Sequence, residues 1–236
     1  MKPQSTILST KQRPIDPPDS IFWMGMDRLR ASCLGIKLVE IGAFFPDERA
    51  LLTPREAARA EGMGLKRHKE FIAARVALKG LARRIGLFDK DTPDSSIETL
   101  GPDEVRPCLA DSTLYCSVSH TRRFAVAVGN VFPVGVDIEV VATKTLRVWH
   151  LFMAPPYQDL LSKPGMEPER TATRAWTMKE AAAKAFGLDL SEAIREVEVV
   201  AVGEEESLLR HRGKTHSVLH AEGQSHVISL LTCDAL

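Results

Sequence analysis

The amino-acid sequence predicts an α+β fold, with short strands in two regions and two long helices. Segments with helical periodicity or high helix propensity run over residues 53–86 and 170–186. Short apolar segments bounded by turn residues occupy residues 114–141 and 196–233. Because such short turns join antiparallel neighbours, we expect small antiparallel sheets that pack against the two helices.

The first half begins with a strand predicted over residues 36–43. Thr53 then stands at a helix N-cap, because Pro54 follows it and Glu56 occupies the capping-box position. The helix is predicted to continue to about residue 85, with an interruption at Gly62 and Gly64. Its buried face is predicted from an apolar stripe, which contains Phe71, Val76, Leu78, Leu81, Ala82 and Ile85.

A polar, proline-rich loop over residues 89–107 leads into the middle of the chain. Strands are predicted there over residues 114–120, 123–129 and 134–141. A helical region over residues 143–162, the loop SKPGMEPE and a helix over residues 170–186 follow. The segments EVEVVAV, HSVLHAEG and SHVISLLTC then predict two or three antiparallel strands. No internal sequence repeat is apparent.

Composition restricts the classes of function. The chain has 236 residues, 44% of them hydrophobic, which is enough to bury a core. Basic and acidic residues both number 31, and this balance argues against a general nucleic-acid binder. No segment has the roughly 18 uncharged apolar residues of a membrane-spanning helix.

The N-terminal residues and the cysteines predict a cytoplasmic protein. Residues 1–20 are expected to be a flexible lead-in, because they lack the apolar stretch of a signal peptide. The four cysteines have neither the paired spacing of a zinc site nor the density of a disulfide scaffold, so free thiols in a reducing compartment are expected. They are Cys33, Cys108, Cys116 and Cys233.

Two acids lie two positions apart in the apolar segment PVGVDIEVV. Side chains alternate along a strand, so Asp137 and Glu139 point the same way. Paired carboxylates are hard oxygen ligands that suit Mg²⁺. An edge strand with a solvated acidic face would show the same spacing, but the apolar flanks weaken that interpretation.

The segment RAWTMKEAAAKAFG places Trp176, Glu180 and Lys184 along one helix face, with Lys179 at its margin. An acid and two bases would then share a surface. Glu180 and Lys184 also have the order of an ordinary surface ion pair, and Trp176 could belong to the core.

The segment CSVSHT ends a predicted strand with Ser119 and His120. A Ser-His-Asp triad is not favoured, because adjacent residues on a strand point to opposite faces and no nucleophile elbow is present. A hydroxyl and an imidazole can instead hold a phosphate, with basic residues nearby in sequence at Arg106, Arg122 and Arg123. A buried histidine bonded to the backbone is the alternative.

Taken in order, the motifs resemble one enzyme family. R-P at residues 106–107, S-x-S-H, G-V-D-I-E and W-x-x-K-E-A-x-x-K are similar to those of 4′-phosphopantetheinyl transferases of the surfactin-synthetase-activating type. The resemblance covers residues 53–186. It implies a pseudo-two-fold pair of similar α/β subdomains, over residues 1–131 and 132–236, with the active site in the cleft between them.

The resemblance also implies an activity. Members transfer the 4′-phosphopantetheine group of coenzyme A to a serine of an acyl, peptidyl or aryl carrier protein, and release 3′,5′-adenosine bisphosphate. They use Mg²⁺, for which Mn²⁺ can substitute. A cytoplasmic monomer that serves secondary-metabolite synthesis is the corresponding expectation, with no nucleic-acid or membrane partner.

Roles for individual residues follow from the resemblance. It implies Asp137, Glu139 and Glu180 as metal ligands, Glu180 also as the general base, and Lys184 as the group that assists the leaving phosphate. The predicted contacts to the phosphates of coenzyme A are Arg75, Arg106, Ser119, His120 and Lys179. Thr121 departs from the family pattern, which has serine there, and the segment FMAPPYQDLL lacks an acid common in that region.

Two further functions remain as alternatives. A catalytically inactive relative could bind coenzyme A or a carrier protein without transfer, although it would not need to keep three carboxylates and two lysines together. A metal-dependent phosphohydrolase could use the same acids, but the sequence lacks a recognisable second cluster of His and Asp.

Overall fold

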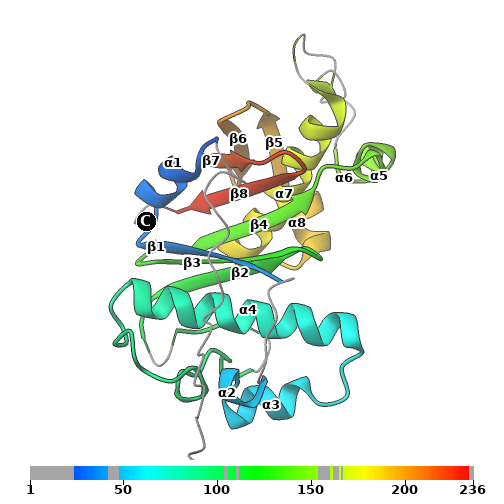
Figure 1. Cartoon of the computed structure of the whole chain (residues 1–236). Helices are drawn as coiled ribbons and strands as arrows, with labels where there is room; N and C mark the ends of the chain where they lie inside the picture. The colour runs from blue at the N-terminus through cyan, green and yellow to red at the C-terminus, as the bar shows by residue number, and fades with distance from the viewer. Residues whose placement is uncertain are drawn as a thin grey trace, which may run out of the picture.

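The computed structural model describes residues 24–41, 48–103, 106–109, 112–153, 160–161, 165 and 167–233. Helices and two antiparallel sheets make up an α+β fold, as predicted (Figure 1). The predicted flexible lead-in and the prolines at positions 155 and 156 lie outside the described residues. No helix of the described residues is long and apolar enough to cross a membrane, and none of the four cysteines forms a disulfide bond.

The first half contains one long helix and three strands among its described residues. In chain order its elements are α1 (Met26–Ala31), β1 (Gly35–Glu40), α2 (Glu48–Leu51), α3 (Pro54–Ala60), α4 (Leu65–Arg84), the 3₁₀ helix η2 (Asp94–Ser96), β2 (Tyr115–His120) and β3 (Phe124–Asn130). Thr53 and Glu56 form the predicted capping box at the start of α3. The predicted interruption at Gly62 and Gly64 separates α3 from α4.

The second half repeats this plan with more strands. Its described elements are β4 (Val134–Val140), α5 (Thr143–Arg147), α6 (Trp149–Phe152), α7 (Pro168–Phe186), α8 (Leu190–Glu196), β5 (Val197–Ala201), β6 (Glu206–His211), β7 (Lys214–Glu222) and β8 (His226–Thr232). Helix α8 and strand β6 were not predicted. The helical region predicted over residues 143–162 contains two short helices, α5 and α6, in its described part.

Each half has its own sheet. Within the described residues the N-terminal sheet has the order β1-β3-β2, and the C-terminal sheet has the order β4-β8-β7-β6-β5. Helix α4 packs on β1 and β3, whereas α7 packs on β4 and β8 (Figure 1). Strands β2 and β4 lie against each other, so the two sheets meet there.

The two halves show an internal repeat that the sequence does not reveal. In each half the first strand pairs with the last, the last pairs with the one before it, and a long helix follows the first strand. Arg84 of α4 donates a hydrogen bond to the carbonyl of Ile36 on β1, at 3.1 Å. Lys184 of α7 donates one to the carbonyl of Val136 on β4, at 2.9 Å. Both members of the second pair lie 100 positions after their counterparts, so β4 and α7 correspond to β1 and α4.

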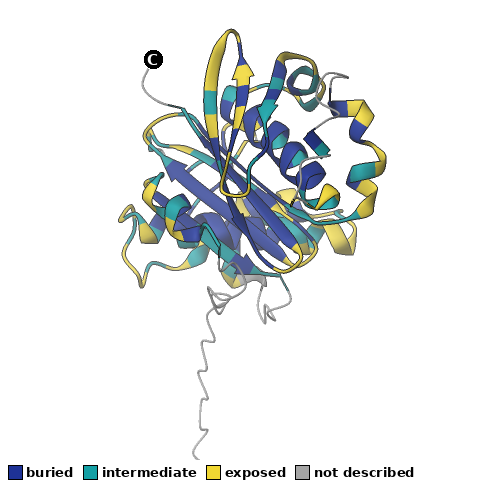
Figure 2. Ribbon diagram, turned by 90° about the horizontal axis from the view of Figure 1, so that it is seen from above, coloured by how far each residue is buried: buried dark blue, intermediate teal, exposed yellow. Residues whose placement is uncertain are grey.

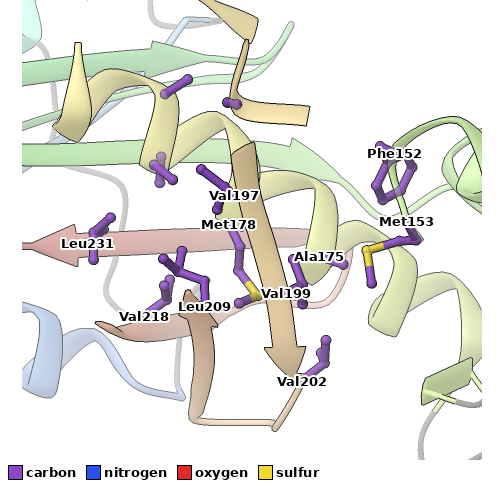
Figure 3. Packing of buried hydrophobic residues seen from close by; sticks show 14 of the residues in the cluster. Phe152, Met153, Ala175, Met178, Val197, Val199, Val202, Leu209, Val218 and Leu231 are labelled. Atoms are coloured by element: carbon purple, nitrogen blue, oxygen red, sulfur yellow. The ribbon is translucent and has the colours of Figure 1, made fainter. Parts of the chain in front are cut away.

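The hydrophobic core is divided between these layers. The buried parts of the chain follow the strands and the inner faces of the long helices (Figure 2). In the second half, Met178 of α7 points toward Val199, Leu209 and Val218 of the sheet (Figure 3). Burial of one such apolar side chain contributes about 1.5–3 kcal/mol. This packing fixes α7 on the sheet, and α7 carries three of the predicted site residues, Lys179, Glu180 and Lys184.

Candidate active site

The site is built where β4 passes close to α7. A Cβ atom at Gly135 would lie 1.9 Å from the carbonyl oxygen of Ala181, so only glycine permits this approach of strand to helix. The contact brings Asp137 and Glu139 of β4 beside Glu180 and Lys184 of α7. Lys184 forms an ion pair with Asp137, and the charges of Asp137 and Lys184 act on both Glu139 and Glu180. The predicted grouping of strand and helix residues is therefore present.

Asp137 is the most buried of the three acids, with 4% of its surface exposed. Its Oδ1 accepts hydrogen bonds from Ser119 Oγ at 2.6 Å and from Lys184 Nζ at 2.8 Å. Its Oδ2 is buried and has no hydrogen-bond partner. A buried carboxylate oxygen without a partner is costly, and a site for an ion is one of its ordinary explanations.

Glu139 and Glu180 are partly buried near this carboxylate. Burial raises the pKa of Glu139, and the charge of Asp137 raises it further. The pKa of Glu180 is raised by burial and then by Asp137, while Lys184 opposes the shift. Like charges held together in this way are stable only when a cation or a proton reduces their repulsion.

These groups fit a hard divalent cation, although they do not form a finished cage. Among the described residues, no three His, Cys, Asp or Glu side chains already converge as a metal cluster. The orphaned Oδ2 of Asp137 and the two neighbouring carboxylates nevertheless supply oxygen donors only, which Mg²⁺ prefers. Mg²⁺ also retains water and substrate ligands, so a complete protein cage is not required.

His120 lies at the end of β2 and is exposed. Partial desolvation lowers the pKa of His120, and the charges of Lys184 and Lys66 lower it further. The charges of Glu70 on α4 and of Asp137 oppose that shift. The histidine therefore lies between the start of α4 and the carboxylates. Sequence reasoning missed Lys66, because nothing in a linear sequence shows that the first turn of α4 lies beside the end of β2.

The structure does not bring Arg75 or Lys179 to the carboxylates. Arg75 is buried in the first half and donates to the carbonyl of Thr99 at 2.8 Å. Lys179 is buried on another face of α7, where its ammonium donates to the carbonyls of Ile194 and Val197 at 2.9 and 2.6 Å. Both cations already have partners within the fold.

Of the other predicted residues, Arg106 is exposed and Trp176 packs in the core. The side chain of Arg106 is 76% exposed and lies 3.9 Å from Asp103. Trp176 packs edge-on against Phe152 with ring centroids 5.2 Å apart, in the hydrophobic core of the second half. The core interpretation of Trp176 therefore holds.

Comparison with known proteins shows the family to which the chain belongs. A model of the 4′-phosphopantetheinyl transferase superfamily matches residues 133–231, which contain all three carboxylates and Lys184. A holo-[acyl-carrier-protein] synthase of Bacillus mycoides (strain KBAB4) is 34% identical over 82 residues, which are 33% of this chain and 69% of that protein. The chain belongs to the 4′-phosphopantetheinyl transferase superfamily.

Two more relatives extend the match to this superfamily. The 4′-phosphopantetheinyl transferase psf-1 of Bacillus pumilus is 35% identical over 80 residues. That match covers 34% of this chain and 34% of that protein. Enterobactin synthase component D of Escherichia coli O157:H7 is 24% identical over 189 residues, which cover 79% of this chain and 87% of that protein. The family and the transferase class predicted from the motifs are confirmed.

Proposed function

We propose that the chain transfers the 4′-phosphopantetheine group of coenzyme A to a serine of an acyl, peptidyl or aryl carrier protein. The observation that supports this proposal best is the gathering of Asp137, Glu139 and Glu180 beside Lys184, next to His120. Carboxylates suit a metal that binds a pyrophosphate, and the two bases suit its phosphate oxygens. The names of the relatives point to the same reaction.

Asp137, Glu139 and Glu180 are the residues that would hold Mg²⁺, or Mn²⁺ in its place. When bound, the ion supplies neutralisation of the pyrophosphate charge. The buried Oδ2 of Asp137 is the donor with the clearest need for a cation. Glu180 comes from α7 and the other two acids come from β4, so two elements would supply the oxygen ligands.

The transfer is a displacement at phosphorus. The serine oxygen forms a bond to the β-phosphorus of coenzyme A, the bond from that phosphorus to the bridging oxygen breaks, and 3′,5′-adenosine bisphosphate leaves. Glu180 accepts the serine proton, a role that its raised pKa favours, and Lys184 donates to the departing phosphate. One carboxylate cannot be a tight ligand and a free base at once, so these roles of Glu180 belong to different moments.

The nucleotide end of coenzyme A is assigned to the first half. His120 and Lys66 are two donors that the structure places near each other, and they suit the 3′-phosphate. Arg106 is exposed enough to join them when substrate binds. In this arrangement residues 1–131 and 132–236 are two subdomains of a monomer, with the site between them.

Intact-mass spectrometry of carrier proteins tests this function. The full chain with coenzyme A and Mg²⁺ should add one phosphopantetheine group to an apo carrier, and EDTA should stop the reaction. Asp137→Ala and Glu180→Gln should each lower the rate by about 10²–10³-fold, the usual effect of removing one charge-stabilising group. Lys37→Met is the matched control, because Lys37 occupies the position on β1 that corresponds to Asp137 on β4.

A panel of acyl, peptidyl and aryl carriers is needed, because the carrier is unknown. No mass increase on any member of the panel would contradict the proposed transfer. Calorimetric binding of coenzyme A without transfer would instead indicate a binding protein that has kept the fold.

A further inference from the structure

A buried chain of hydrogen bonds links three strands of the second sheet to α7. Its side chains are Ser207 of β6, His220 of β7, Ser229 of β8 and Thr177 of α7, each at most 1% exposed. Ser207 Oγ lies 2.6 Å from His220 Nε2, and His220 Nδ1 lies 2.9 Å from Ser229 Oγ. The hydroxyl oxygens of Ser229 and Thr177 are 2.5 Å apart.

One end of the chain fixes the direction of these bonds. The backbone N–H of Gly203 donates to Ser207 Oγ at 3.1 Å, so His220 Nε2 is the acceptor left for the Ser207 hydroxyl among the described residues. Burial lowers the pKa of His220 to about 3, and the charges of two arginines lower it further. The ring is therefore neutral, and its one proton is on Nδ1.

From His220 the donors continue toward the helix. Nδ1–H donates to Ser229, and the Ser229 hydroxyl donates to Thr177. Thr177 then donates to the carbonyl of Thr173 or Arg174, at 3.1 and 3.0 Å. Every donor in the chain has an acceptor, and a buried polar network satisfied in this way holds its members rigidly.

The helix end of this chain lies behind the acids of the site. Ser229 pairs directly with Asp137 across β8 and β4, so their side chains lie on the same face of the sheet. Thr177 lies about one helical turn before Glu180 on α7. The bond from Ser229 to Thr177 therefore joins the helix of one acid to the strand beside the other.

The first half builds the corresponding layer with apolar side chains. One residue of β3 pairs with both β1 and β2, as Ser229 pairs with Asp137 on β4 and with His220 on β7. By these registers, and by the offset of 100 positions between the long helices, the counterparts of Thr177, Ser229 and His220 are Ala77, Ala127 and Val118. The scaffold can therefore be built without the polar chain, which occurs in the half that carries the acids.

We infer that Thr177 is a positioning residue, held by Ser229 and His220, that keeps α7 at the distance from β4 at which their acids share a divalent cation. The inference rests on the metal site of the proposed function. Burial of polar groups is costly, and a fixed arrangement of helix and strand is a use that offsets this cost. Groups that orient metal ligands without touching the metal commonly control metal affinity.

Mn²⁺ binding to the full chain, measured by electron paramagnetic resonance with coenzyme A present, tests this role without turnover. Thr177→Val keeps the branched shape of threonine and removes the hydroxyl. The affinity for Mn²⁺ should fall about 10-fold, the low end of the effect of removing a group that orients a ligand. Thr177→Ser retains the hydroxyl and should restore most of the affinity.

Thr173→Val is the matched control. Thr173 is a buried threonine one turn earlier on α7, and its hydroxyl donates to the carbonyl of Glu169 at 2.7 Å. Because this bond stays within the helix, its loss should leave the affinity for Mn²⁺ within about twofold. Thermal unfolding shows whether each variant is folded.

Two substitutions of His220 test the chain at its centre. The amide nitrogen of asparagine lies near the position of Nδ1 and can donate to Ser229, whereas the longer glutamine reaches the position of Nε2 and contacts Ser207. His220→Asn should therefore keep most of the Mn²⁺ affinity, and His220→Gln should lower it about 10-fold. This pair decides the question if Thr177→Val does not fold.

The results separate this inference from the proposed function. Equal Mn²⁺ affinity of Thr177→Val and the unsubstituted chain would overturn the positioning role and leave the proposed transfer intact. An equal loss in Thr173→Val, or equal affinities of the two His220 variants, would also overturn it, because the effect would not follow the bond to Ser229. If the unsubstituted chain binds no Mn²⁺ in the presence of coenzyme A, the metal site and the positioning role fail together.

Discussion

The strands β4 and β1 present different side chains to the long helices beside them. Asp137 corresponds to Lys37, and Glu180 corresponds to Gly80. The methylene groups of Lys37 lie over Gly80, where a Cβ atom would be 2.9 Å from the Cε of the lysine. At these two positions the second half has the acids Asp137 and Glu180, whereas the first half has Lys37 packed over Gly80. The scaffold is common to both halves, and the acidic site depends on side chains that only one half carries.

The ends of β2 and β7 differ in a related way. The turn after β2 has a hydrogen bond from Thr121 N–H to the carbonyl of Phe124, and the turn after β7 has one from Gly223 N–H to that of His226. This correspondence matches His120 with Glu222. The histidine is exposed near Lys66, whereas the glutamate is buried and bonded to two arginines of α7, Arg170 and Arg174.

A cavity of about 250 Å³ lies beside this glutamate, lined in part by the same two arginines. The carboxylate of Glu222 already occupies the guanidinium groups, so an anionic ligand would have to displace it. Of these two strand ends, the one at His120 has the more accessible basic groups, because His120 is exposed and the side chain of Lys66, although paired with Glu70, is 69% exposed.

The largest expected difference between the halves concerns two buried lysines. Lys79 of α4 forms an ion pair with Glu56, and both side chains are fully buried. Its counterpart Lys179 donates only to backbone carbonyls in the structure. Lys79→Met should lower the free energy of unfolding by about 3–5 kcal/mol, because it leaves a buried carboxylate without its cation. Lys179→Met should cost about 1–3 kcal/mol, because it leaves only carbonyl groups unpaired.

Urea unfolding of the two variants gives this comparison. The double variant Lys79→Met with Glu56→Gln should recover much of the unfolding free energy that Lys79→Met loses. Glutamine has the size of Glu56, and its neutral amide replaces the buried, unpaired carboxylate. Equal losses for the two lysine variants would show that the carboxylate is not what separates the halves.

The sequence predicted much of the local structure, because local structure depends on neighbouring residues. The capping box of Thr53 and Glu56 is visible in four residues, and it caps α3 as expected. Apolar segments between turn residues likewise predicted β2, β3 and β4. Strand β6 was missed, because its sequence ESLLRH has two charged ends and little apolar character.

The site was predicted only where a motif carries it. Asp137 and Glu180 come from short motifs, and the structure brings them together. The contact of Ser119 with Asp137 joins two strands of different sheets, so no sequence pattern contains it. The motif also could not show that Lys179 turns away into the core, because adjacent positions on a helix differ by about 100° in direction.

A pH titration gives the second contrast. Burial lowers the pKa of Lys179 from its ordinary value of 10.5 to about 8, and no other cause contributes. Between these values the unfolded chain binds a proton that the folded chain does not, so the contribution of Lys179 to folding stability rises with pH. Below pH 8 both states carry the proton and the full cost of burying the charge is present.

The unfolding free energy of the unsubstituted chain, relative to Lys179→Met, should therefore rise by on the order of 2–3 kcal/mol from pH 7.5 to 10.5. Comparison with the variant removes the effect of other titrating groups. Lys90→Met is the control, because Lys90 is exposed, and its difference from the unsubstituted chain should stay constant. A constant difference for Lys179→Met as well would mean that its ammonium is not desolvated.

The smallest expected effect is at Gly80, the counterpart of Glu180. Alanine inside α4 should gain about 0.5–1 kcal/mol of helix stability over glycine. Its Cβ would meet the Cε of Lys37 at 2.9 Å and the Cγ at 3.2 Å, and a flexible side chain can move that far. Gly80→Ala should therefore change the unfolding free energy by less than about 0.5 kcal/mol and leave transfer activity unchanged. A loss above about 2 kcal/mol in thermal unfolding would show that Lys37 is packed rigidly on α4, so that the first half could not accept an acid at this position without rebuilding the strand.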